Sequence, residues 1–239
     1  MNLNRAHNRR PESPRHSKFI RGFTPHAPGS VLVECGRTKV LCTATVTDKA
    51  PAWNPGKAWL TAEYSMLPGS TESRKSRDGR TGRVDGRAYE IQRIIGRSLR
   101  SMLDFTILPE CTIWVDCDVL SADGGTRTAA INAAAIALFD AALWLEERKL
   151  VRRSPIRQLV TAVSVGIVKG NPLVDLDYQE DAQAEVDMNV VCTADDKLVE
   201  VQSTAEKTTF DVEQLNTMLG MARTACHEIL LKQREALHI

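Results

Sequence analysis

Two glycines, a threonine and an arginine stand directly before a long apolar run in the stretch SADGGTRTAAINAAAIALFDAALW, residues 121–144. The run predicts a helix, and the glycines predict the loop that leads into its first turn. A helix N-terminus presents unpaired N–H groups and a partial positive charge, which together bind anions. The guanidinium of Arg127 suits phosphate oxygens. The stretch therefore fits either a phosphate site or a tight turn in which Arg127 forms a structural ion pair.

Carboxylates are concentrated later in the chain, between residues 173 and 191: Asp175, Asp177, Glu180, Asp181, Glu185 and Asp187. If a strand begins near Glu185, the alternation of its side chains directs Val186 and Met188 into the core and Asp187 to the opposite face. Asp187 then lies at the mouth of a strand, with Asp181 on the preceding loop. Such a pair could bind Mg²⁺, or one member could act as a general acid. The alternative is an acidic, solvated turn.

Basic residues gather in two places, although the net charge of the chain is only +1. The N-terminal arm, residues 1–22, contains six Lys or Arg and one acidic residue, and a second basic segment runs from Ser73 to Arg87. Local basic patches favour a polyanion such as nucleic acid, while solvated loops are the alternative. A phosphate loop, an acidic pair and basic segments together suit phosphoryl transfer on a nucleic acid. The loop lacks the G-x-x-x-x-G-K-[ST] spacing, which argues against ATP or GTP.

The elements that must position these groups follow from the hydrophobic pattern, which mixes strands and helices without strict alternation. We expect hairpins over 30–46 and 159–178, strands over 60–67, 111–120, 185–193 and 198–205, and helices over 87–103, 126–144 and 211–237. The helix after the glycine loop is apolar nearly all round, which predicts a buried central helix. Asp211 is the expected N-cap of the last helix, with Gln214 three residues on. We predict an α+β fold and one compact domain over residues 1–239.

Bulk composition is that of a globular protein, with 43% hydrophobic and 26% charged residues among 239. The six cysteines form no C-x-x-C pair and lie mostly in apolar runs, which predicts buried, reduced thiols. The N-terminus lacks the apolar segment of a secretory signal, and we expect no apolar run to be long enough to cross a bilayer. We therefore expect a cytoplasmic protein without a membrane partner.

Several stretches taken together resemble the ribonuclease PH family, in family order from about residue 29 to the end. They are GSVLVECGRTKVLC, WLTAEYSMLP, EIQRIIGRSLR, IWVDCDVLSADGGTRTA, VSVGI, DLDYQEDAQAEVDMNVV and VEVQSTAE. The resemblance implies a β-α-β-α fold, similar to the second domain of ribosomal protein S5, and a homohexamer built as a trimer of dimers. It also implies a phosphate-dependent 3′-to-5′ exoribonuclease that trims tRNA 3′ ends and releases nucleoside 5′-diphosphates.

The same resemblance implies roles for individual residues. Orthophosphate, the co-substrate, would be held by Arg87, Gly125, Thr126 and Arg127. The essential carboxylates would be Asp181 and Asp187, both near Mg²⁺, with Asp187 as the metal ligand and Asp181 as the proton donor to the leaving 3′-oxygen. Candidate RNA contacts are Arg93 and Arg97 on the arginine-bearing helix, which could also serve ring packing, and Arg74 and Arg77 in the second basic segment.

The chain departs from the family pattern at its N-terminus, where Arg5, Arg9 and Arg15 are kept but little else. It also departs at Gly69, Ala88, Ala130, Ala182 and Ser203. None of these changes removes a proposed phosphate ligand or carboxylate, so we predict activity that is retained, whether full or reduced. The alternative is a non-catalytic RNA-binding ring subunit of the same fold. Retention of all four charged site residues favours the enzyme.

Overall fold

The computed structural model describes residues 5–77 and 86–239. Its elements follow in the order η1 (Ala6–Asn8), β1 (Ser17–Arg21), β2 (Gly29–Cys35), β3 (Thr38–Thr47), β4 (Trp59–Met66), α1 (Gly86–Arg100), β5 (Thr112–Ser121), α2 (Thr126–Glu147), β6 (Val160–Val168), β7 (Asn171–Val174), α3 (Tyr178–Gln183), β8 (Val186–Thr193), β9 (Leu198–Ala205) and α4 (Val212–Leu237). The expected hairpins, strands and long helices are all present. The sequence pattern missed η1, β1 and α3.

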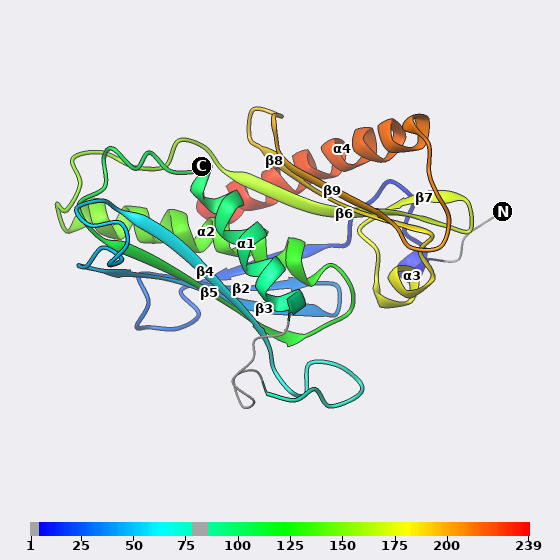
Figure 1. The fold of residues 1–239 in the computed structure, drawn as a ribbon, viewed down its shortest axis with the longest axis horizontal. Helices are drawn as coiled ribbons and strands as arrows, with labels where there is room; N and C mark the ends of the chain where they lie inside the picture. Colours follow the sequence, from blue (N-terminus) through cyan, green and yellow to red (C-terminus); the bar gives the residue numbers. More distant parts are fainter. Residues whose placement is uncertain (1–4, 78–85) are drawn as a thin grey trace.

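The strands form two sheets, which lie on opposite sides of α1 and α2 (Figure 1). The first sheet has the order β1-β2-β3-β5-β4, in which only β4 and β5 run parallel. The second sheet has the order β7-β6-β8-β9 and is antiparallel throughout. Helix α4 covers the far side of the second sheet (Figure 1). The layers are thus sheet, helices, sheet and helix, which confirms the expected β-α-β-α arrangement.

Helix α2 lies in the interior, where it packs against β2 and β3 of the first sheet and β6 of the second. Gly29 of β2 lets the two backbones approach closely, because a Cβ added there would lie 1.8 Å from the Ala137 carbonyl oxygen of α2. The helix is 22 residues long and apolar enough to pass as a membrane span, so the expectation that no run would do so is wrong. A helix buried between two sheets needs an apolar surface on all sides, as a membrane-spanning helix does.

Two local predictions are also confirmed by the structure. The Asp211 carboxylate accepts a hydrogen bond from the Gln214 amide N–H at 2.8 Å, and the Gln214 side chain accepts one from the Asp211 N–H at 3.0 Å. This reciprocal pair caps the first turn of α4. All six cysteines are free and buried.

Candidate active site

The glycine loop runs from the end of β5 into α2 and adopts a backbone that favours glycine. Gly124 and Gly125 have φ values of +74° and +61°. A Cβ on Gly124 would lie 2.4 Å from the Leu176 carbonyl oxygen, so the loop contacts the segment between β7 and α3 without a side chain between them. Gly125 is the N-cap residue of α2 and has no side chain to cap the first turn. The first N–H groups of the helix are therefore available to an anion.

Arg127 extends from the first turn of α2 toward β9. Its Nη1 donates to Oε1 of Gln202 at 2.9 Å, and Nε2 of Gln202 donates to Oε1 of Glu90 on α1 at 2.5 Å. Within residues 5–77 and 86–239, no carboxylate forms an ion pair with Arg127. The structural ion pair considered from the sequence is therefore not formed. A neutral amide orients the guanidinium, and its positive charge remains for a ligand.

Three of the six carboxylates have structural partners. Asp175 is buried and forms an ion pair with Arg15 at 2.7 Å. Asp177 caps α3 by accepting the Glu180 amide N–H, and Glu180 in turn pairs with Arg5 at 2.7 Å. The simple alternative of a solvated acidic turn is therefore wrong for these three residues.

Asp181, Glu185 and Asp187 remain, and the environments of Asp181 and Asp187 disfavour negative charge. Burial raises the pKa of the Asp187 carboxyl above its usual value, and the nearby Asp181 charge adds to the rise, whereas Arg127 opposes it. Partial desolvation likewise raises the pKa of Asp181, which lies exposed on α3, against the charges of Arg87 and Arg127. Asn189 donates to Oδ2 of Asp187 at 3.1 Å. Two carboxyls with raised pKa values between two arginines are typical of a catalytic site.

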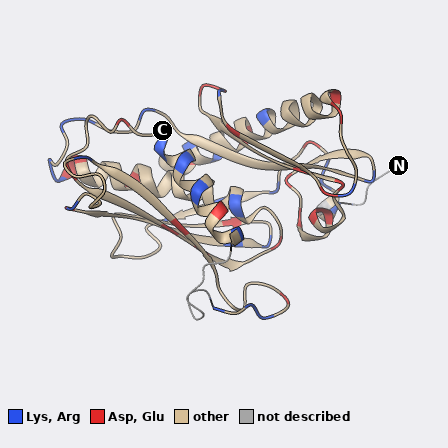
Figure 2. Ribbon diagram, in the orientation of Figure 1, with Lys and Arg blue, Asp and Glu red and all other residues tan. Residues whose placement is uncertain are grey.

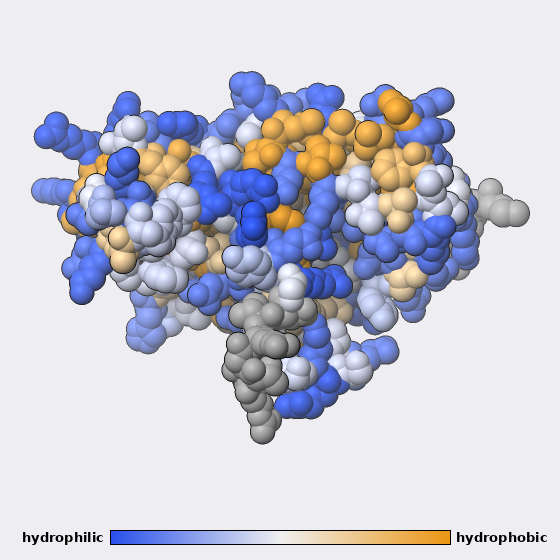
Figure 3. Space-filling model, viewed as in Figure 1, coloured by the Kyte–Doolittle hydropathy of each residue, from blue (hydrophilic) through white to orange (hydrophobic). Residues whose placement is uncertain are grey.

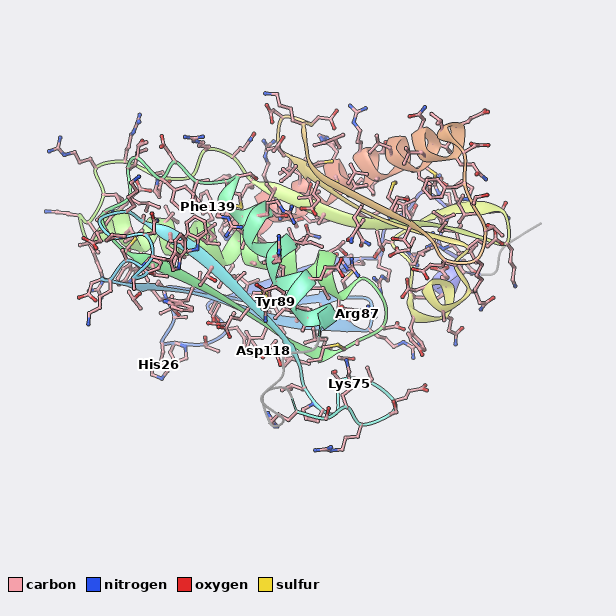
Figure 4. All side chains as sticks on the ribbon, in the orientation of Figure 1. His26, Lys75, Arg87, Tyr89, Asp118 and Phe139 are labelled. Carbon is pink, nitrogen blue, oxygen red and sulfur yellow. The ribbon has the colours of Figure 1, made fainter. Side chains whose placement is uncertain are left out.

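Arg87 completes this group from the other side. It lies in the first turn of α1, close to the start of α2 (Figure 4). Its charge acts on both Asp181 and Tyr64, and the Tyr64 hydroxyl shares a hydrogen bond of 2.7 Å with the Thr126 hydroxyl. The structure thus brings together the residues predicted for phosphate binding and for acid or metal chemistry.

A polar pocket of about 160 Å³ opens between these elements. Its lining residues are all charged or polar: Glu90, Arg127, Asp187, Asn189, Gln202, Thr204 and Glu206. One liquid water occupies about 30 Å³, so the pocket has room for a small tetrahedral anion together with water.

The N-terminal segment fixes the two loops relative to each other. The Arg15 guanidinium donates to both carboxylate oxygens of Asp175, at 2.7 and 2.9 Å, and to the carbonyl of Asp123 at 2.6 Å. Burial alone would raise the pKa of Asp175, but Arg15 outweighs it and the pKa falls. Arg5 and Arg9 pair with Glu180 in the same way. The expectation of a polyanion-binding arm is therefore wrong for these arginines, which are turned inward onto carboxylates.

Comparisons with known proteins identify the fold and the family. Residues 13–143 match the model described as "3' exoribonuclease family, domain 1", and residues 158–225 match "3' exoribonuclease family, domain 2". The ribonuclease PH of Frankia casuarinae is 52% identical over 235 residues, which cover 98% of this chain and 93% of that protein. This chain belongs to the 3′ exoribonuclease family. The prediction of a phosphorolytic 3′-to-5′ exoribonuclease is thereby confirmed.

Solved structures share the fold of this exoribonuclease at low sequence identity. Rice (Oryza sativa) Rrp46 superposes with a TM-score of 0.79 at 22% identity, covering 98% of this chain and 100% of that one. The Archaeoglobus fulgidus exosome with RNA bound to the active site gives 0.83 at 21% identity, covering 97% and 93%. The two family domains correspond to the two sheets, and one hydrophobic cluster includes residues of both. A single domain over residues 1–239 stays a prediction.

The four predicted RNA contacts lie on two different elements of this exoribonuclease. Arg74 and Arg77 are exposed on the loop after β4, which projects from the body of the molecule (Figure 1). Residues 78–85 of the same basic segment lie outside the described residues. Arg93 is exposed on α1, whereas Arg97 forms an ion pair with Glu200 of β9 at 3.0 Å. Arg97 therefore joins the two halves of the chain.

The departures from the family pattern lie beside the site residues but replace none of them. Ala88 and Ala130 are buried in the core, where their methyl groups pack without polar atoms. A Cβ on Gly69 would meet nothing within 4 Å, and Ala182 is exposed on α3. The Ser203 hydroxyl is buried and has no hydrogen-bond partner among the described residues. A glycine there would remove that unsatisfied group.

Sequence reasoning missed three residues that orient the site: Tyr64, Glu90 and Gln202. Gln202 lies 75 positions from Arg127 in the chain, so their hydrogen bond depends on the packing of α2 against the second sheet. The available signal was a polar residue within the strand pattern of residues 198–205. A polar residue at such a position indicates a solvent-facing side chain, but it does not predict which residue that side chain contacts.

Proposed function

We propose that this exoribonuclease holds orthophosphate at Arg87, at Arg127 and at the N–H groups of the loop Gly125–Arg127, where the Thr126 hydroxyl is also available. One observation carries the proposal: Arg127 stands at an uncapped helix start with a neutral amide as its partner, between Arg87 and two carboxyls with raised pKa values. A dianion placed there replaces no existing ion pair of Arg127. The arrangement therefore supports binding of the nucleophile of a phosphorolytic reaction.

The geometry suits one balanced step. An oxygen of orthophosphate forms a bond to the last phosphorus of the RNA, and the bond from that phosphorus to the 3′-oxygen of the preceding nucleotide breaks. The products are a nucleoside 5′-diphosphate and an RNA one nucleotide shorter. Asp181 gives a proton to the leaving 3′-oxygen, a role favoured by its raised pKa.

Mg²⁺ fits the same carboxyl groups. Among the described residues, no group of three or more His, Cys, Asp or Glu side chains is arranged as a metal site. Mg²⁺ in phosphoryl-transfer sites uses only one or two carboxylates, with waters and substrate phosphates as the other ligands. Burial and the Asp181 charge destabilise the Asp187 anion, and a cation would relieve that repulsion. Asp187, with Asp181 beside it, would hold the ion, which offsets negative charge on the scissile phosphate.

The substrate and the assembly belong to the same proposal. We infer that tRNA 3′ ends are the substrate, and that the protein works in the cytoplasm as a homohexamer built as a trimer of dimers. Two observations support an assembly. The archaeal relative of the same fold is an exosome, and the edge strand β9 exposes Leu198 and Val201. An exposed edge strand with apolar side chains favours contact with another chain.

The phosphate site is tested by Arg127→Ala, with Arg223→Ala as the control. Arg223 is an exposed arginine of α4 whose partner is Asp196, far from the glycine loop in the chain. We expect Arg127→Ala to lower phosphate-dependent nucleotide release at least about a hundredfold, because it removes a charge aimed at the transferred group. Arg223→Ala should release nucleotide at the wild-type rate. Near-normal turnover by Arg127→Ala would show that the loop is not the phosphate site.

A further inference from the structure

A strongly basic loop joins α2 to β6 at the end of the molecule away from the phosphate loop (Figure 2). Its ten residues, 148–157, read RKLVRRSPIR and contain five cations and no carboxylate. All five cations are exposed: Arg148, Lys149, Arg152, Arg153 and Arg157. In the space-filling view this end carries mostly hydrophilic side chains (Figure 3).

The fold explains only some of these charges. Arg148 and Lys149 follow the last turn of α2, where cations complement the helix dipole, and Arg148 lies 4.6 Å from the ring centroid of Trp144. Arg157 pairs with Asp104 at 3.3 Å. Arg152 and Arg153 are beyond the helix and form no ion pair within the described parts of the chain. No carboxylate of the described residues neutralises these two exposed charges, which favours an anionic partner.

An exposed aromatic cluster adjoins this loop. Trp53 is 66% exposed and packs edge-on against Trp59, with ring centroids 4.8 Å apart. Trp59 also lies beside Phe105, at 6.5 Å, and beneath the Arg100 guanidinium, at 4.7 Å. Phe105 follows Asp104, the partner of Arg157, so the aromatic cluster and the basic loop share one surface. Bases of single-stranded RNA stack on such aromatic and arginine groups.

We propose that residues 148–157 and Trp53 form a second RNA-binding surface, which holds the substrate upstream of its 3′ end. The proposal rests on the exoribonuclease function given above. The cations suit the phosphodiester backbone, and Trp53 suits an unpaired base. An acidic protein would use the cations but gains little from the exposed Trp53, so RNA is the better partner.

The length of α2 determines how long an RNA must be to contact both the active site and this surface. Its 22 residues separate the phosphate loop from the basic loop by about 33 Å, at 1.5 Å per residue. Stacked nucleotides advance by about 3.4 Å each, so RNA must extend at least about ten nucleotides from the reacting end to contact both places. A short oligonucleotide therefore occupies the active site alone, and a tRNA reaches both.

The test compares wild type with a double variant that carries both Arg152→Gln and Arg153→Gln. Each protein is assayed on two substrates. The substrates are a 3′-extended tRNA and a five-nucleotide RNA. We expect KM for the tRNA to rise about tenfold in the double variant. The slope of log KM against log salt concentration should fall by about two. Both parameters should stay unchanged for the five-nucleotide RNA. The control, Lys232→Gln with Arg234→Gln on α4, removes two exposed charges elsewhere and should leave both substrates unaffected.

Trp53→Ala supplies a second, charge-neutral variant. We expect its tRNA KM to rise about tenfold, with an unchanged salt dependence and unchanged use of the five-nucleotide RNA. Equal effects on both substrates, or no effect on either, would overturn the proposal. Loss of oligomeric state in size-exclusion chromatography with tRNA binding intact would also overturn it, because the surface would then be a protein contact.

Direct binding separates this proposal from the proposed function. Fluorescence anisotropy of labelled 3′-extended tRNA measures affinity without turnover. If wild type releases no nucleotide but the arginine variant still binds tRNA about tenfold more weakly, the phosphorolytic function fails and the second surface stands. If turnover is normal and tRNA affinity is unchanged in the arginine variant, the second surface fails alone.

Discussion

Asp187 is held where its negative charge is disfavoured, on β8 beside Asp181. Burial and the neighbouring carboxylate raise its pKa above the usual value, although Arg127 partly opposes the shift. A carboxyl whose pKa is higher in the folded than in the unfolded protein lowers stability while it is ionised. Its stabilising contribution is complete below the unfolded pKa and is lost as the pH rises through the folded pKa. At neutral pH the anion therefore costs stability, and the proposed catalytic role accounts for its presence there.

Asp187→Asn should separate function from stability. We expect the variant to lose Mg²⁺-dependent nucleotide release by at least about a hundredfold, while it still binds RNA. Its Tm at neutral pH should equal or exceed that of wild type, since the uncharged amide carries no desolvated charge. The difference in Tm should shrink as the pH falls and the wild-type carboxyl becomes protonated. An asparagine variant that is active, or that melts well below wild type at neutral pH, would contradict this role.

Residue types pointed to the proposed reacting groups more directly than to the residues that orient them. Arg127, Asp181 and Asp187 were predicted because a cation at a helix start and paired carboxylates each have a direct chemical use. The structure brings them together with Arg87. Gln202 was missed because its role comes from a contact between distant segments, which no local pattern encodes.

At the scale of elements, the N-terminal segment acts as a clamp. Arg15 links the carboxylate of Asp175, before α3, to the carbonyls of Asp123 and Gly124 in the glycine loop. Thr38 of β3 adds a hydrogen bond to the Gly124 carbonyl at 2.7 Å. The phosphate loop and the carboxylate segment are therefore held by one buried guanidinium.

Arg15→Ala should destabilise the whole protein and displace both loops. Removal of one partner leaves the Asp175 charge buried and unpaired, which costs about 3–5 kcal/mol. Chemical denaturation measures that loss, and nucleotide release should fall with it. Arg10→Ala is the control, because Arg10 pairs with Glu12 on the surface with 81% of its side chain exposed. Equal stability of the two variants would show that Arg15 is not a clamp.

The packing of α2 on β2 gives a second prediction for elements. Gly29→Ala should destabilise the protein by about 1–3 kcal/mol, because the new Cβ would overlap the Ala137 carbonyl of α2. Gly220→Ala, in the exposed face of α4, meets nothing within 4 Å and should stabilise by up to about 1 kcal/mol through helix propensity. Thermal melts of both variants check the signs. A stable Gly29→Ala protein would mean that the helix and sheet can separate.

Periodicity predicted the long elements because each one has a single buried face or a fully buried surface. Helix α1 buries Ile91, Ile95 and Leu99, and α2 is buried on nearly every side. Strand β1 was missed because its cations concealed the pattern, and α3 has only six residues with none buried. The inward-facing arginines of the N-terminal segment cannot be told from solvated or RNA-binding arginines by sequence alone. Their role as ion-pair partners depends on carboxylates in a distant part of the chain.

At the scale of the molecule, the active site forms where the two halves of the chain meet. The first half supplies the helix starts that carry Arg87 and Arg127, and the second half supplies Asp181 and Asp187. Helix α2 lies between the two sheets and fixes their separation (Figure 1). The proposed phosphate binding and proton transfer thus depend on the contact between the two halves, which a single family domain would lack.

The identity of the released nucleotide tests the central claim most directly. Purified protein is incubated with a 3′-extended tRNA and Mg²⁺, with and without orthophosphate, and the products are separated by chromatography. We expect nucleoside 5′-diphosphate in the presence of orthophosphate and no release in its absence, because in our proposal the loop at Arg127 binds the nucleophile. Nucleoside 5′-monophosphate released without orthophosphate would contradict phosphorolysis and make the enzyme a hydrolase.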